Sequence, residues 1–151
     1  MGDRIVIRIT DVDRRSPDLY CHWAGLRAVK AVHDALPESR RDIHNLICNV
    51  IVKVMCGECS DASYYLYDSG EAEGMADWDN WTWTFDLAAR MWRSTMPQLE
   101  GRLLTISEAD DFVRSVRPCL YSECPCDTFD LPSETGKPRY SDTVYATREG
   151  C

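Results

Sequence analysis

The sequence predicts an α+β domain in which an antiparallel sheet of about five strands is covered by a helical hairpin. Several short segments alternate apolar and polar residues, as strands with one buried face do. Two consecutive segments carry apolar residues at helical spacing instead. The chain has 151 residues and a hydrophobic fraction of 44%, which is enough for one domain with its own core. We expect that domain to span residues 1–117, and residues 118–151 to form an irregular, cysteine-rich tail.

The first two expected strands form a hairpin. In "RIVIRIT", Arg4 to Thr10, isoleucines at every second position indicate a strand with one buried face. The polar stretch "DVDRRSPD" is typical of a turn. Leu19–Trp23 is then the predicted returning strand.

Two helices are expected next. Apolar residues between Ala24 and Leu36 share one helical stripe, which includes His33 as a buried core histidine, and Pro37 ends this helix. A second helix is predicted from about Glu38 to Met55. Its β-branched second half, "NVIVKV", leaves a strand over residues 48–55 as the alternative.

Later segments complete the predicted sheet. Strands are expected at Ser63–Asp68 and at Asn80–Asp86, where "NWTWTFD" alternates aromatic and polar residues. Leu87–Thr95 is either a short helix or an extended segment, and "EGRLLTI" is a further strand. Ser107 is the predicted N-cap of a helix that runs to about Val116.

Charge and hydropathy restrict the classes of function. The net charge of −8 and the pI of about 4.8 argue against direct nucleic-acid binding, which needs a surplus of Lys and Arg. The longest strongly apolar run, "VIVKVMC", is too short to cross a bilayer. The N-terminal "MGDRIVIRIT" lacks the apolar stretch of a signal peptide. We therefore expect a cytoplasmic protein without membrane contact, in the host cytoplasm if a phage encodes it.

The eight cysteines suggest reduced thiols or a metal site in a chain without an export signal. Cys56 and Cys59 have the C-x2-C spacing of a zinc knuckle, and Cys124 and Cys126 lie in the tail. One hypothesis is a structural zinc held by these four thiolates, with His22 as an alternative ligand. The other is that the thiols are scattered and unliganded, and the sequence requires no cofactor.

The chain carries no recognisable catalytic motif. It has no G-x-S-x-G elbow, no H-E-x-x-H pair and no phosphate-cradling glycine loop. We therefore expect a binding protein rather than an enzyme.

Aromatic residues instead indicate a ligand site. Five Trp and seven Tyr exceed what a small core needs, and aromatic faces stack flat heterocycles. Trp23 and Arg27 lie one helical turn apart beside an expected helix N-terminus at Ala24–Gly25, which attracts anions. We expect a small nucleotide-like ligand there, bound by a homodimer. The candidate ligand-binding residues are Trp23, Arg27, His22, Tyr65, Trp81 and Arg102, although Trp81 also fits the core face of a strand.

The segment Tyr20-Cys21-His22-Trp23-Ala24-Gly25 resembles a Tyr-x-His-Trp-x-Gly pattern of small phage and prophage accessory proteins. Over about residues 4–27 the chain also resembles the phage Thoeris anti-defence proteins. The resemblance implies a viral protein that sequesters a cyclic ADP-ribose-type signal without cleaving it, with Trp23 and Arg27 in contact with that ligand. Two alternatives remain: an acidic inhibitor of a host nucleic-acid-binding defence complex, similar to an anti-CRISPR protein, and a zinc-stabilised structural domain.

Overall fold

The structure is a computed structural model that describes residues 3–39, 42–55 and 63–121. The chain divides into two units, Met1–Asp110 and Asp111–Cys151, where the sequence had suggested a division after residue 117. The first unit contains the sheet and the first two helices. In the second unit, the described residues form the end of the third helix and a 3₁₀ turn at Pro118–Tyr121.

The described residues form a mixed α+β fold, which confirms the predicted class. The helices are α1 (Arg27–Ala35), α2 (Ile43–Met55) and α3 (Ile106–Val116). The strands are β1 (Ile5–Asp11), β2 (Arg14–Arg15), β3 (Asp18–His22), β4 (Ser63–Tyr67), β5 (Thr82–Asp86), β6 (Met91–Ser94) and β7 (Leu104–Thr105).

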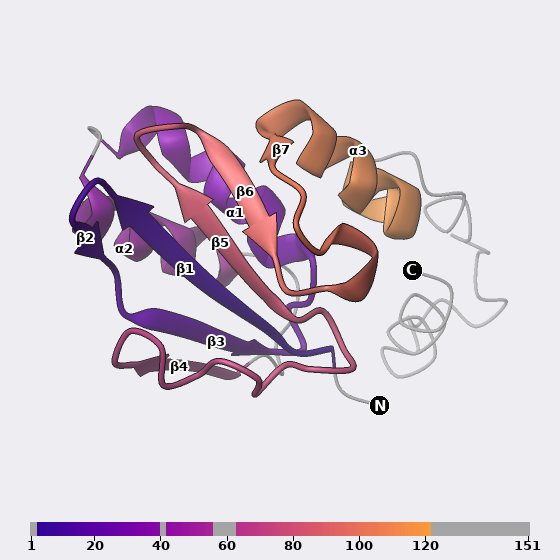
Figure 1. The fold of residues 1–151 in the computed structure, drawn as a ribbon, viewed down its shortest axis with the longest axis horizontal. Helices are drawn as coiled ribbons and strands as arrows, with labels where there is room; N and C mark the ends of the chain where they lie inside the picture. The colour runs from indigo at the N-terminus through magenta and orange to yellow at the C-terminus, as the bar shows by residue number, and fades with distance from the viewer. Residues whose placement is uncertain (1–2, 40–41, 56–62, 122–151) are drawn as a thin grey trace, which may run out of the picture. The chain divides into compact units, whose positions relative to one another are not determined.

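The strands lie in one sheet in the order β4-β3-β1-β5-β6-β7, with β2 added beside β1. Pairing is antiparallel except between β1 and β5, which are parallel. The prediction of a purely antiparallel sheet is therefore wrong at this pair. The parallel pair arises because the segment 68–81 runs from the end of β4 to the start of β5, on the other side of β1 (Figure 1). An alternating pattern predicts a strand, but it does not give the strand's direction.

One face of the sheet is covered by α1 and α2 (Figure 1), which both contact β1. The predicted isoleucine face of β1 supplies Ile5, Ile7 and Ile9, which are fully buried there. α2 is helical through Met55, because its buried residues Ile43, Leu46, Ile47, Val50 and Val54 follow helical spacing. The strand alternative for residues 48–55 is therefore wrong.

Several boundaries differ from the sequence prediction: α1 begins at Arg27 rather than near Ala24, and α2 begins at Ile43 rather than near Glu38. Two further differences have local reasons. Residues 87–90 form a turn, so only Met91–Ser94 of the segment 87–95 is extended. The cap of α3 is Thr105 rather than Ser107: the Glu108 amide donates to Thr105 Oγ1 (3.2 Å), and the Thr105 amide donates to Glu108 Oε2 (2.8 Å). This reciprocal pair is a capping box, which a Thr-x-x-Glu spacing favours.

Candidate functional site

The sheet face opposite the helices carries arginines and threonines. Side chains alternate between the two faces along a strand, so Arg8 and Thr84 lie opposite the buried isoleucines of β1 and the aromatics of β5. The register pairs Thr84 with Arg8 of β1 on one side and with Arg93 of β6 on the other. An Arg–Thr–Arg row thus crosses three neighbouring strands. We call this side of the sheet the open face.

The segment 68–81 covers the β1–β3 half of the open face. Its Ala72 and Ala76 are fully buried against Val6 and Tyr20 of the sheet. The segment 68–81 does not extend over the β5–β6 half of the open face.

Arg8 lies at the boundary between the two halves. Its Nε and Nη2 donate to the two carboxylate oxygens of Asp18, at 2.7 and 2.9 Å. The Asp18 carboxylate is fully buried and also accepts the amides of Gly70 (2.9 Å) and Ala72 (3.3 Å). The hydrogen bonds from Arg8 to Asp18 raise the pKa of Arg8. The hydrogen bonds from Gly70 and Ala72 to Asp18 tie the covering segment to the sheet.

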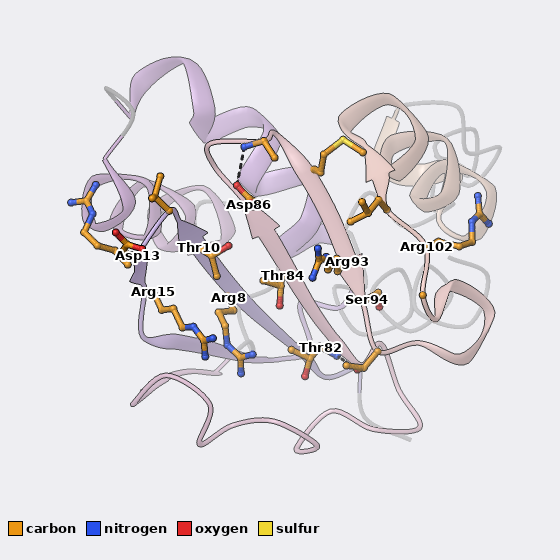
Figure 2. A pocket seen from close by; sticks show the side chains of 17 residues that line it. Arg8, Thr10, Asp13, Arg15, Thr82, Thr84, Asp86, Arg93, Ser94 and Arg102 are labelled. Atoms are coloured by element: carbon orange, nitrogen blue, oxygen red, sulfur yellow. Dashed lines mark hydrogen bonds between the residues drawn. The ribbon is translucent and has the colours of Figure 1, made fainter.

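Beyond this boundary the open face forms a hollow of about 920 Å³ over β1, β5, β6 and the residues before β7 (Figure 2). Most of its lining residues are polar or charged. The lining includes five arginines (Arg8, Arg14, Arg15, Arg93 and Arg102) but only two aspartates (Asp13 and Asp86). A positive hollow therefore lies on a chain whose net charge is −8.

The arginines differ in how far their charge is neutralised. Arg14 is bonded to Asp11 (2.8 Å), and Arg8 to Asp18. Arg15 and Arg93 are exposed, and neither forms an ion pair with any residue in the described ranges. Their guanidinium groups are accordingly available to an anion.

Hydroxyl groups lie between these arginines. Thr10, Thr82 and Thr84 project from β1 and β5 on the viewed side of Figure 2. Thr82 is 2% exposed, and its Oγ1 has no hydrogen-bond partner within the described part of the chain. A buried hydroxyl without a partner costs about 1–3 kcal/mol.

Of the residues proposed from the sequence to bind a ligand, only Arg102 lines the hollow. The rings of His22 and Trp23 stack on each other, with centroids 4.9 Å apart. Tyr65 lies on β4 against Tyr20, at 6.1 Å. The Trp81 ring packs against the Trp78 ring, with centroids 5.8 Å apart.

The expected anion position beside α1 contains a protein carboxylate. Gly25 has a positive φ of 51°, and its amide donates to the carbonyl of Asp3 (3.0 Å). The Asp3 carboxylate lies where a Cβ on Gly25 would be. Because this carboxylate is itself an anion, the position at Gly25 disfavours a second one.

His33 is a core histidine, as the sequence predicted. Its Nε2 accepts the indole N–H of Trp92 (2.7 Å), so Nδ1 carries the proton and donates to Asp110 (2.8 Å). Burial lowers the pKa of His33, and Asp110 partly opposes that effect. Both ring nitrogens are engaged, which suits a structural role rather than proton transfer.

The proposed zinc ligands Cys56, Cys59, Cys124 and Cys126 lie outside the described residues. Within the described ranges, no group of three or more His, Cys, Asp or Glu side chains is arranged to hold a metal ion. Burial raises the pKa of the Cys21 thiol to about 12, so this cysteine is neutral. The zinc hypothesis stays a prediction.

Sequence reasoning missed the Arg–Thr–Arg row, because Arg8 and Arg93 meet only through the strand register.

None of the helices in the described segments is long and apolar enough to cross a membrane. No family model matches the chain, and neither the curated proteins nor the solved structures contain a match to it.

Proposed function

We propose that this chain is a non-enzymatic binding protein that holds a small, phosphate-bearing ligand of the nucleotide type on the open face of its sheet. The observation that carries the proposal is Arg93. Its exposed guanidinium has no counter-ion among the described residues, and it stands beside Thr84 in a positive hollow on an acidic chain.

The chemistry of the hollow suits a phosphate group. A guanidinium presents two parallel N–H donors to phosphate oxygens, and threonine hydroxyls add further donors. Adjacent strands lie about 5 Å apart, so the Arg93 guanidinium and the Thr84 hydroxyl can reach the same bound group. The carboxylates of Asp13 and Asp86 offer acceptors to the hydroxyls of a sugar.

The size of the hollow is also appropriate. Small-molecule sites commonly enclose about 300–1,000 Å³, and this hollow measures about 920 Å³. Its lining residues include no histidine, the side chain that most often acts as general base. None of the hydrogen bonds among the described lining residues joins a hydroxyl to a carboxylate, so the proposal is binding without turnover.

The biological role that we propose is sequestration of a signalling nucleotide by a phage-type anti-defence protein. Support for this part is the resemblance of residues 4–27 to the Thoeris anti-defence proteins. Our proposal differs from that resemblance in the binding residues, which we assign to the open face rather than to Trp23 and Arg27.

Isothermal titration calorimetry with cyclic ADP-ribose, ADP-ribose and adenosine tests the proposal. The two phosphorylated ligands should bind and adenosine should not. Arg93→Ala should weaken binding about tenfold or more, because hydrogen bonds to charged groups contribute about 1.5–3 kcal/mol.

Two arginine variants serve as controls. Arg90→Gly removes a guanidinium from the same β5–β6 hairpin but outside the hollow, and it should leave the affinity unchanged. Arg27→Ala should also leave it unchanged. If Arg27→Ala loses binding and Arg93→Ala retains it, the ligand site lies at the start of α1 and not on the open face.

A second candidate function is inhibition of a basic host protein. The exposed carboxylates of Asp68 and Glu71, on the segment that covers the sheet, favour it. Such binding should weaken steeply with added salt. The double variant Asp68→Asn and Glu71→Gln should abolish capture of the host protein, while nucleotide binding at the open face should persist.

A further inference from the structure

The two edges of the sheet are built differently. At one edge, β7 contains only two residues and leads directly into α3, so it offers almost no backbone for pairing. At the other edge, β4 is a five-residue strand, Ser-Tyr-Tyr-Leu-Tyr. Very short edge strands are one of the ways in which proteins prevent edge-to-edge association. The β7 edge has this protection and the β4 edge does not.

Within the described residues, the β4 edge also lacks protective charges, proline and bulges. Its five residues include no lysine, no other charged residue and no proline, and its pairing with β3 continues through all five residues without a bulge. Tyr65 and Leu66 are 51% and 55% exposed. An uncharged, regular edge strand with exposed aromatic and aliphatic side chains is a template for another strand.

From these features we infer that β4 is a dimerisation strand, which pairs antiparallel with β4 of a second copy of this chain about a two-fold axis at Tyr65. Symmetric pairing about this residue places Tyr65 opposite its own counterpart. Leu66 then lies opposite the Tyr64 of the other copy, and Tyr67 opposite Ser63. Aromatic–aromatic and aromatic–aliphatic cross-strand pairs each contribute about 0.2–1 kcal/mol.

Charge favours a second copy at this strand. Two chains of net charge −8 repel each other over most of their surface. The β4 edge is a neutral strip at which two copies can approach without opposing carboxylates along the five paired residues. The strand is also its own complement, because each exposed side chain meets an apolar or hydroxyl-bearing partner in the symmetric register.

Apolar surface beside β4 adds to the area that a stable dimer needs, which is about 1,000 Å² or more in total. Tyr64 and Leu66 point to the helix side of the sheet, since their register partners Cys21 and Leu19 do. There the Tyr64 hydroxyl reaches the Val54 carbonyl near the end of α2 (3.5 Å). Met55, the next residue of that helix, is 61% exposed.

The test is the mass of the full chain by light scattering coupled to size-exclusion chromatography. The wild-type chain should be a dimer, and Leu66→Lys should be a monomer at the same concentration, because it places two buried ammonium groups in the symmetric interface. Leu103→Lys is the matched control, since Leu103 is 52% exposed away from β4, and it should stay dimeric. A monomeric wild-type chain, or a dimer that Leu66→Lys leaves intact, overturns the inference.

A cross-linking variant decides the case in which Leu66→Lys does not fold. Directly opposed residues on antiparallel strands have Cα atoms about 4.5–5.5 Å apart, which lies within the range that a disulfide spans. Tyr65→Cys should therefore form a disulfide between copies under mild oxidation, located at position 65 of both chains by peptide mapping. Tyr67→Cys should not, because it faces Ser63. Equal cross-linking of the two variants contradicts the register. Neither test uses a ligand, so the outcome is independent of the proposed binding function.

Discussion

The two sides of β5 have opposite properties. On the helix side, Trp83 and Phe85 are fully buried, and both pack against Trp92 of β6 with centroids 5.8 and 4.9 Å apart. On the open side, Thr82 and Thr84 line a polar hollow together with Arg93. Five consecutive residues thus belong alternately to the core and to the candidate site. If the proposed ligand binds the open face, stability and binding depend on different faces of this strand, and substitutions should separate them.

The largest expected effect is on the helix side. Phe85→Ala should lower the free energy of unfolding by about 3–5 kcal/mol, because it leaves a cavity in a fully packed core. Thr84→Ala, one residue away on the other face, should change it by only about 0.5 kcal/mol and weaken ligand binding instead. Urea unfolding and calorimetry measure the two quantities. Equal destabilisation by both variants would remove the distinction between the faces.

The second prediction compares two arginines of one row. Arg8→Met should destabilise the fold by about 3 kcal/mol, because it leaves the buried Asp18 carboxylate without its cation. Arg93→Ala should leave stability nearly unchanged, since its guanidinium is exposed. Adding Asp18→Asn to Arg8→Met should recover part of the loss. If Arg8→Met is as stable as the wild type, the Arg8–Asp18 pair does not hold the covering segment in place.

The third prediction concerns pH and the helix side. The pKa of His33 is lowered in the folded state, so the unfolded state binds a proton more readily, and stability is lost as pH falls from the unfolded value of about 6.5 through the lower folded pKa. Protonation removes the acceptor of the buried Trp92 N–H, a loss of about 1–3 kcal/mol.

Unfolding curves of the wild type and of His33→Gln between neutral and mildly acidic pH test this effect. The glutamine variant should lack this part of the pH dependence, because an amide oxygen accepts the Trp92 N–H at every pH in that range. Identical pH profiles for the two proteins would show that His33 does not titrate as inferred.

The smallest expected effect lies in the turn that joins β5 to β6. Arg90 has a positive φ of 56°, a conformation that glycine adopts without a steric penalty. Arg90→Gly should therefore be neutral or raise stability by about 0.5 kcal/mol, with no change in ligand affinity. A marked loss of stability would mean that the Arg90 side chain makes a stabilising contact.

Local patterns predicted most of the elements but not their long-range arrangement. The alternation in "RIVIRIT" and "NWTWTFD" identified β1 and β5, and helical spacing identified α1 and α2. The parallel β1–β5 pair was not predictable from them, because an alternating pattern is the same in both directions. It depends on the path of residues 68–81, whose acidic and glycine-rich sequence predicts only a loop.

The residues of the candidate site were also only partly predictable, because long-range strand pairing brings them together. Arg102, which the sequence proposed as a ligand-binding residue, lines the hollow, and its role in binding stays a prediction. Arg8 and Arg93 belong to strands far apart in the sequence, and the register alone brings them to either side of Thr84. Trp23 was expected to end a regular strand. Its positive φ of 70° turns the chain there instead, and its ring lies on His22.

The most direct test of the account is an NMR titration of the ¹⁵N-labelled full chain with ADP-ribose. The account predicts that the amides of Arg8, Thr84 and Arg93 shift together as ligand is added, along with the Thr82 amide beneath them, while those of Trp23 to Arg27 do not. Shifts confined to Trp23–Arg27, or no shifts at saturating ligand, would contradict a nucleotide site on the open face.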